Sequence, residues 1–195
     1  MIYLIDDDAS VREALHLLLQ TYDLSVSCFA SPAECLAHLD RSQPGVLIMD
    51  LRMPLMSGLQ LYEQLRAQGV DWPAIVITGH GDLHSCRRAF KAGVTDFLTK
   101  PIEEQTLLEA IRTAQATLAR QAERNEARHH LQVLTERERE VLELITKGLG
   151  SKEIAAALDI SVRTVDTHRA KLAEKLGTGS VAEQTRLLLS AAARS

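Results

Sequence analysis

The stretch Gly45-Val46-Leu47-Ile48-Met49-Asp50-Leu51-Arg52-Met53-Pro54 decides the fold of this chain. Its apolar run predicts a buried strand, and the Met53-Pro54 pair ends that strand. Asp50 then stands at the carboxyl end of a buried strand, where a carboxylate is poorly solvated unless a positive group meets it. Ligands of open α/β sheets bind at this same edge. An aspartate at a strand end can also simply cap the next turn, so Asp50 alone leaves both interpretations open.

Length and composition are compatible with one large domain or two small ones. The 195 residues are 46% hydrophobic but only 4% aromatic, which predicts aliphatic cores. The net charge of −4 excludes a uniformly basic nucleic-acid binder. The charge is uneven, because residues 1–120 carry 15 acidic and 10 basic side chains and residues 121–195 carry 11 and 12. The two halves are therefore compatible with different partners.

The cysteines and the apolar runs indicate the cellular compartment in which the protein is expected. Cys28, Cys35 and Cys86 lack metal-ligand spacing and are interpreted as small buried hydrophobes in a reducing compartment. The N-terminus becomes acidic too early for a signal peptide. No apolar run reaches the roughly 18 residues that a membrane helix needs. We expect no membrane partner and a cytoplasmic protein.

Four further stretches around the Asp50 strand are predicted to be strands. They alternate with five helical patterns over the first 120 residues or so, in the order of a doubly wound parallel sheet. The fold class expected for this half is α/β with a five-stranded sheet. The four stretches are Ile2 to Ile5, Leu24 to Phe29, Ala74 to Thr78 and Asp96 to Leu98.

Polar side chains stand at the ends of these predicted strands. In a parallel sheet the carboxyl ends share one edge, so these side chains should converge there with Asp50. Asp6-Asp7-Asp8 in particular places three repelling acids together, which a cation or a helix N-terminus has to relieve. The expected members of the cluster are Asp6, Asp7, Asp50, Thr78 and Lys100.

The rest of the chain has a different pattern. From Leu107 to about Arg128 there is no Pro or Gly, so the fifth helix of the first half is predicted to run on as a helical, solvated linker over residues 119–133. Thr135-Glu136-Arg137-Glu138 is a capping box that begins a new domain over residues 134–195. Within it, a short helix from Ser151, a turn at Asp159-Ile160 and a longer helix from Ser161 to Leu176 form a helix-turn-helix. Four helices in all make this second domain all-α.

At this point the residues resemble a known family. Residues 1–118 are similar to the receiver domain of two-component response regulators, and residues 134–195 resemble the LuxR-type DNA-binding domain. Together they resemble transcription regulators of the FixJ/NarL type. The receiver likeness rests on Asp6-Asp7, Asp50, Met53-Pro54, Thr78, Phe97 and Lys100-Pro101. The LuxR likeness rests on Leu134 to Glu138, Gly148-Leu149, Lys152 to Ala155 and Thr164 to Arg169.

The resemblance implies a chemistry for the strand-end cluster. Asp50 would accept a phosphoryl group from the histidine of a sensor kinase. Asp6, Asp7, Asp50 and the backbone carbonyl of Arg52 would hold Mg²⁺, a cation that prefers oxygen ligands. Lys100 would pair with the phosphoryl oxygens.

Three further residues receive expected roles near this site. Thr78 would act as the switch by donating its hydroxyl to the phosphoryl group, and Phe97 would turn into the vacated space, although Phe97 can equally be a plain core aromatic. Arg52 and His80 would overlook the site and tune hydrolysis of the phospho-aspartate.

The second domain is expected to bind double-stranded DNA through the helix from Ser161 to Leu176. Val165, Leu172 and Leu176 should be buried, with polar side chains toward the groove and phosphates. From Leu134 onward there are only 10 basic and 9 acidic residues, so one copy should bind weakly. The candidate contacts are Lys152, Arg163, Thr164, Asp166, Thr167, His168, Arg169, Lys171 and Lys175.

Weak binding by one domain implies a homodimer, formed on phosphorylation, on paired half-sites. RNA polymerase is a further candidate partner. The predicted helix from Leu83 to Ala92, where relatives often carry aliphatic dimer contacts, is polar and basic here, so the dimer surface stays open.

Three other functions remain alternatives to a non-enzymatic, phosphorylation-switched transcription factor. A Mg²⁺-dependent phosphatase would use Asp50 as nucleophile, but its usual second acid is replaced by Arg52. A ligand-sensing LuxR-type regulator would not need the triple-acid loop or Lys100-Pro101. A receiver that acts through partner binding without phosphate is argued against by the intact set of strand-end residues.

Overall fold

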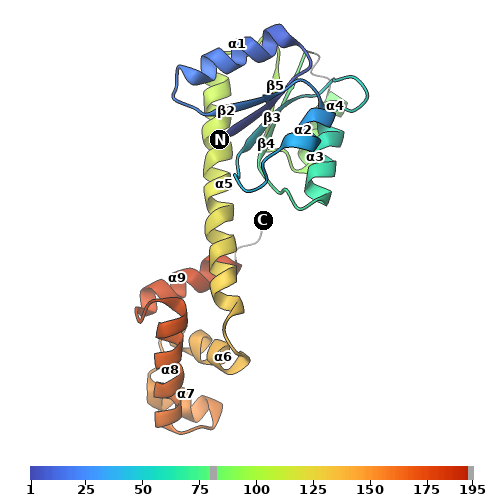
Figure 1. Ribbon diagram of the computed structural model, residues 1–195. Helices are drawn as coiled ribbons and strands as arrows, with labels where there is room; N and C mark the ends of the chain where they lie inside the picture. Colours follow the sequence, from blue (N-terminus) through green and yellow to red (C-terminus); the bar gives the residue numbers. More distant parts are fainter. Residues whose placement is uncertain (80–82, 193–195) are drawn as a thin grey trace. The chain divides into compact units, whose positions relative to one another are not determined.

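The computed structural model describes residues 1–79 and 83–192 (Figure 1). The chain divides into two compact units, residues 1–119 and 120–195. Helix α5, Glu104–Gln132, contributes to both units. Each unit has its own buried core and is described by itself.

The first unit contains the predicted five-stranded parallel sheet, with strand order β2-β1-β3-β4-β5. The central strands β1, β3 and β4 are buried on both faces. Their apolar runs follow from this, because a parallel sheet covered by helices has no solvent face. The strands are β1 Ile2–Ile5, β2 Val26–Phe29, β3 Val46–Asp50, β4 Ala74–Thr78 and β5 Asp96–Thr99.

Helices cover both faces of the sheet (Figure 1). One core cluster joins the sheet to α2, α3 and α4, and another joins it to α1 and the first part of α5. This arrangement confirms the doubly wound α/β fold. The helices are α1 Ala9–Gln20, α2 Pro32–His38, α3 Gly58–Ala67 and α4 Leu83–Ala92.

Strand β2 is shorter than predicted and begins at Val26 rather than Leu24. Asp23 adopts a left-handed conformation with φ 55°, and the backbone N–H of Leu24 donates to the carbonyl of Leu19. Leu24 therefore closes the end of α1 instead of pairing in the sheet. Alternating hydrophobicity in this stretch misled the sequence prediction about where the strand starts.

The second unit is helical and includes the second half of α5. The predicted helix-turn-helix is present, because α7 and α8 are joined by a turn in which Asp159 has φ 51°. Ser161 caps α8 by accepting the backbone N–H of Thr164 at 3.1 Å. The remaining helices are α6 Glu136–Thr146, α7 Ser151–Leu158, α8 Val162–Leu176 and α9 Val181–Ala192.

The stretch predicted as a linker, residues 119–133, falls almost entirely within α5. From residue 120 onward it groups with the second unit. Ala127 is buried there, and Leu131 packs against the core formed by α6, α7 and α8. This part of α5 therefore adds to the core of the second unit.

Across residues 1–79 and 83–192, none of the helices combines the length and apolar character needed to cross a membrane.

Candidate functional site

Strand register brings the predicted polar residues of the first unit to one edge. Ile5 lies opposite Met49, and Asp50 lies opposite Ile77. Asp6, the residue after β1, and Asp50, the last residue of β3, are therefore at the same level on neighbouring strands. Thr78 pairs with Thr99, which places Lys100 one residue beyond the end of β5. The sheet thus gathers side chains that are far apart in the sequence.

Lys100 links the two buried carboxylates of this edge. Its Nζ lies 2.9 Å from Oδ2 of Asp6 and 2.7 Å from Oδ1 of Asp50. Asp6 is 1% exposed and Asp50 is 6% exposed. One ammonium group therefore faces two buried carboxylates, which leaves this triad of Asp6, Asp50 and Lys100 with a formal excess of negative charge.

The carboxylates also shift the pKa of the lysine. Partial burial acts to lower the pKa of Lys100, but the hydrogen bonds and charges of Asp50 and Asp6 outweigh it, so the net pKa is raised above the usual lysine value. Lys100 consequently remains charged at neutral pH.

Backbone groups hold the triad in place. The N–H of Arg52 donates to Oδ2 of Asp50 at 2.6 Å, and the N–H of Asp8 donates to Oδ1 of Asp6 at 2.9 Å. The N–H of Lys100 donates to the carbonyl of Thr78 at 2.7 Å. The Lys100–Pro101 peptide bond is cis. The first two hydrogen bonds orient the carboxylates of Asp50 and Asp6, and the third holds the backbone of Lys100 beside Thr78.

The three consecutive acids Asp6, Asp7 and Asp8 have different environments. Asp6 turns into the triad, Asp7 is exposed, and Asp8 caps α1 by accepting the N–H groups of Ser10 and Val11 at 2.9 and 3.3 Å. Repulsion among the acids is thus relieved by Lys100 and by a helix N-terminus, as the sequence pattern predicts.

The carboxylates of this edge are candidate ligands for a metal ion. In the part of the chain that the structure describes, no three His, Cys, Asp or Glu side chains are grouped as a metal site. Asp6 and Asp50 nevertheless share a single positive group, the Lys100 ammonium, and their carboxylate oxygens are ligands that suit Mg²⁺. The donor set therefore fits this ion, provided that exposed Asp7 joins the two buried carboxylates.

The other predicted residues of the edge occupy different environments. Thr78 is fully buried at the end of β4. Phe97 is half-buried and packs against the core cluster on the α3 and α4 side, so it is at least a core aromatic. The side chain of Arg52 lies at the surface, where it lines a cavity of about 160 Å³ together with Arg88. His80 lies outside the described residues.

Two residues that support the site were missed by sequence reasoning. Arg12 donates from Nη1 to the backbone carbonyl of Asp6 at 2.7 Å. Gly58 packs so closely beneath β3 that a Cβ atom there would collide with the carbonyl oxygen of Asp50. A glycine at a helix start is a common capping choice, so only the packing reveals this requirement.

The second unit presents the predicted helix α8. Val165, Leu172 and Leu176 are buried, as expected. The side chains that face solvent include most of the candidate DNA contacts. Lys152, Arg163, Asp166, Thr167, Lys171 and Lys175 are exposed, and Thr164, His168 and Arg169 are half-buried.

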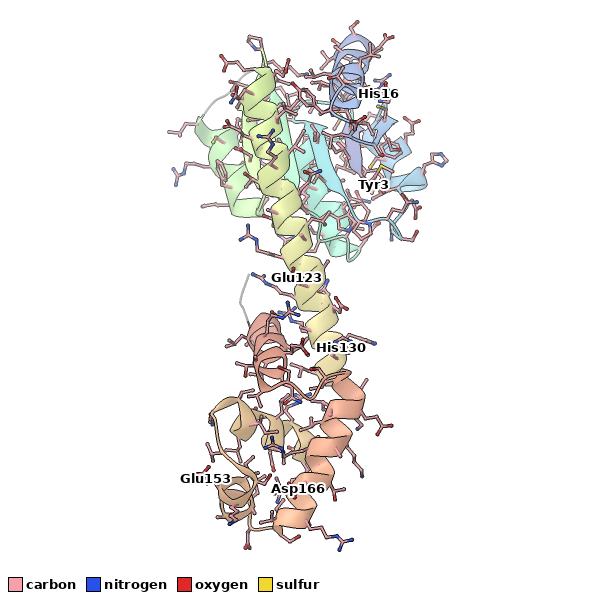
Figure 2. The ribbon with its side chains drawn as sticks, turned by 90° about the vertical axis from the view of Figure 1, so that its left-hand side faces the viewer. Tyr3, His16, Glu123, His130, Glu153 and Asp166 are labelled. Carbon is pink, nitrogen blue, oxygen red and sulfur yellow. The ribbon has the colours of Figure 1, made fainter. Side chains whose placement is uncertain are left out.

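Two of these candidates also make internal contacts. Lys175 Nζ lies 2.7 Å from Oε2 of Glu138, which is 3% exposed, and it donates to the carbonyl of Val133 at 3.1 Å. Asp166 accepts the hydroxyl of Ser151 at 2.8 Å and so ties α8 to α7; Asp166 is marked in Figure 2. These two side chains have structural roles in addition to the DNA contact predicted for them.

Burial acts to raise the pKa of Glu138, but hydrogen bonds from Lys175 and Thr135 and the lysine charge outweigh it. The net pKa of Glu138 lies below the usual glutamate value. Glu138 is also the last residue of the predicted capping box, and its Oε2 accepts the N–H of Thr135 at 2.8 Å. The ion pair with Lys175 therefore braces the start of α6.

Two family models match the chain, and each match lies within one of the two units. Residues 2–112 match the model of the response regulator receiver domain. Residues 132–188 match the model described as bacterial regulatory proteins, luxR family.

Curated relatives align over nearly the whole chain. The response regulator protein TodT of Pseudomonas putida F1 is 42% identical over 192 residues, which cover 96% of this chain and 84% of TodT. The transcriptional regulatory protein FixJ of Rhizobium meliloti is 40% identical, with 96% of this chain and 94% of FixJ covered.

Solved structures agree with these matches. The response regulator StyR is similar with a TM-score of 0.73 and 41% identity, covering 96% of this chain and 97% of StyR. Full-length FixJ from B. japonicum has a TM-score of 0.57 and 36% identity, covering 97% and 96%.

Proposed function

Because the chain belongs to the family of two-component response regulators that join a receiver domain to a LuxR-type DNA-binding domain, we propose that a phosphoryl group on Asp50 switches its binding to DNA. The donor would be the phosphohistidine of a sensor kinase. The observation that supports Asp50 most directly is the triad, in which one lysine bridges two buried carboxylates at a ligand-binding sheet edge.

Phosphoryl transfer depends on positioning and charge neutralisation more than on covalent help from the protein. A carboxylate oxygen of Asp50 would form a bond to phosphorus as the bond from phosphorus to the kinase imidazole breaks. The Arg52 N–H and Lys100 already orient the Asp50 carboxylate. Lys100 then pairs with the added phosphoryl oxygens as a compact charge.

The excess negative charge of the triad needs a further cation before another anionic group can enter. Asp6, Asp7, Asp50 and the backbone carbonyl of Arg52 would hold Mg²⁺, which supplies neutralisation of the phosphoryl charge. Asp6 and Asp50 are already together, whereas Asp7 has to turn inward from its exposed position.

Thr78 is the proposed switch residue. It is buried at the end of β4, and its carbonyl accepts the N–H of Lys100, so it is joined to the triad through the backbone. Its hydroxyl would donate to a phosphoryl oxygen, and Phe97 would follow. A complete shift from 1:99 to 99:1 between two states takes about 5.5 kcal/mol of differential binding energy. A partial shift suffices for regulation.

The output would be sequence-specific binding of double-stranded DNA by α8. Exposed Arg163, Thr167 and Lys171 are available on α8, and Lys152 is exposed on α7. Phosphorylation would favour a homodimer on paired half-sites, and RNA polymerase is a candidate partner at promoters. A regulator of chromosomal genes would act in the cytoplasm.

The test is phosphorylation of the full chain by acetyl phosphate with Mg²⁺, followed by intact-mass measurement. The native protein should gain one phosphoryl mass, and Asp50→Asn should gain none. Glu138→Gln serves as the matched control, because it alters a buried carboxylate that also pairs with a lysine, and it should gain the same mass as the native protein. A phosphoryl mass on Asp50→Asn, or none on the native chain, would overturn the assignment.

A further inference from the structure

A small cavity lies among the loop that follows β3, the start of α3 and helix α4. Helices α3 and α4 lie next to each other on this side of the sheet (Figure 1). The volume of the cavity is about 160 Å³, several times the roughly 30 Å³ that one water molecule occupies in the liquid. Its lining contains two arginines and no acidic residue, which favours an anion as ligand. The lining residues are Leu51, Arg52, Ser57, Leu59, Ser85 and Arg88.

The cavity adjoins the proposed phosphoacceptor through the residues that follow it. Leu51, in the lining, is the next residue after Asp50. The backbone N–H of Arg52 donates to Oδ2 of Asp50 at 2.6 Å, while the side chain of Arg52 lines the cavity. A small phosphodonor with its phosphoryl group at Asp50 would therefore have the cavity within reach of its leaving group.

Arg88 brings a positive charge to this cavity from α4. Its side chain is exposed, and within residues 1–79 and 83–192 it makes no ion pair with a carboxylate. The hydroxyl of Ser57, in contrast, already caps α3 by accepting the N–H of Gln60 at 3.2 Å. A guanidinium group presents a planar set of donors that matches a carboxylate in a bidentate manner. The charge of Arg88 is therefore suited to binding an anionic group next to Asp50.

Phosphodonors differ in the charge of the group that leaves. With an acyl phosphate, an Asp50 oxygen forms a bond to phosphorus while the bond from phosphorus to the acyl oxygen breaks, and the electron pair leaves on a carboxylate. Phosphoramidate reacts with its nitrogen protonated, so its leaving group is neutral ammonia. A positive group placed where negative charge develops lowers the barrier of the reaction that develops it. Arg88 would therefore assist the acyl phosphate and not phosphoramidate.

We propose that Arg88, with Arg52 beside it, forms a subsite for the carboxylate leaving group of an acyl phosphate. This inference rests on the proposed phosphorylation of Asp50 and adds a preference among its small-molecule donors. The chain would react faster with acyl phosphates than with donors that release a neutral group. Transfer from a sensor kinase releases an imidazole, so that route would not depend on Arg88.

The test compares two small donors, acetyl phosphate and phosphoramidate, on the full chain with Mg²⁺. Time courses of intact mass give the rate of phosphoryl gain from each donor at equal concentration and pH. The readout is the ratio of the two rates within one protein, because misfolding or weaker Mg²⁺ binding lowers both rates together. Arg88→Gln should lower the ratio of the acetyl phosphate rate to the phosphoramidate rate by about 10-fold, as expected for the loss of one charge-assisted contact.

Arg87→Gln is the matched control, because Arg87 is also exposed on α4 but lies outside the cavity lining. It removes the same charge and should keep the native ratio. Arg88→Lys retains the charge without the bidentate geometry and should give an intermediate ratio. A native ratio in Arg88→Gln, or an equal fall in Arg87→Gln, would overturn the subsite and leave the phosphorylation of Asp50 standing. No phosphoryl gain by the native chain from either donor would overturn the proposed function, and this inference with it.

Discussion

Each unit contains a buried carboxylate that meets a lysine at the same distance. Lys100 lies 2.7 Å from Asp50 in the first unit, and Lys175 lies 2.7 Å from Glu138 in the second. The carboxylates are similarly buried, at 6% and 3% exposure. Distance and burial alone therefore do not separate a functional site from a structural brace.

The difference lies in the number of charges. Glu138 has one lysine and completes a capping box, so the Glu138–Lys175 pair is formally neutral. Lys100 serves two carboxylates, so the triad retains excess negative charge and calls for a cation. A balanced pair is costly to break, because removal of one partner leaves the other charge buried and unpaired, whereas an unbalanced cluster at a strand-end edge is suited to binding and chemistry.

Replacing each lysine separately with methionine should show the largest difference between the triad and the Glu138–Lys175 pair. Lys100→Met should slow phosphoryl acceptance from acetyl phosphate by about 100-fold or more, because it removes a preorganised charge from the transferring group. Lys175→Met should leave that rate unchanged. A time course of intact mass measures both. Equal rates in the two variants would show that the triad and the pair do not differ as we describe.

A larger side chain beneath Asp50 should lower the stability of the first unit. Gly58→Ala forces a Cβ atom against the Asp50 carbonyl and should lower the free energy of unfolding by about 1–3 kcal/mol. Trp72 is the single tryptophan of the chain and stacks on Tyr3, so its fluorescence reports this unit alone. Gly79→Ala, which places its Cβ in open space, is the control and should unfold with the native midpoint.

The brace in the second unit should have a smaller effect that depends on pH. Lys175→Met should lower the stability of this unit by about 1–2 kcal/mol, because Glu138 loses its charged partner. The folded-state pKa of Glu138 is lowered, so its contribution is present above the usual glutamate pKa and is lost as the pH falls through the lowered value.

Helical circular dichroism during denaturation, with Trp72 fluorescence to subtract the first unit, follows this loss. The native protein should be destabilised in acid more steeply than Lys175→Met. If the stability of the two proteins falls with pH to the same extent, the Glu138–Lys175 pair does not contribute to stability as we describe.

The smallest expected effects concern DNA contacts on α8. Lys171 is exposed, and Lys175 is engaged by Glu138. Lys171→Ala should reduce the slope of log affinity against log salt by about one unit on a random-sequence duplex. Lys175→Ala should change that slope less. A larger change for Lys175 would mean that it leaves Glu138 to contact phosphate.

Much of the first unit could be predicted from its sequence, for a physical reason. Alternating strand and helix patterns leave few topologies, and a parallel sheet must bring its strand ends to one edge. Asp6, Asp50, Thr78 and Lys100 therefore converge as expected. The caps at Thr135 and Ser161 were also predictable, because they depend on neighbours within three residues.

Contacts that depend on how elements pack could not be predicted. The sequence pattern of α8 predicts only a DNA contact for Lys175, because nothing in it shows that Glu138, 37 residues earlier, is buried against this lysine. The pairing of Cys28 with His16 depends on how α1 lies over β2, and the sequence interpretation of Cys28 as a small hydrophobe omits it. The periodicity of a sequence identifies which face of a helix is buried, but it does not identify the residues that this face packs against.

The central claim is that charge placed on Asp50 alters DNA binding by the second unit. The direct measurement is the affinity for a duplex selected from genomic fragments, with and without acetyl phosphate and Mg²⁺, for the native chain and Asp50→Asn. We predict that affinity changes on phosphorylation of the native protein and stays constant in Asp50→Asn. Equal affinity for the phosphorylated and unphosphorylated native protein would contradict the account.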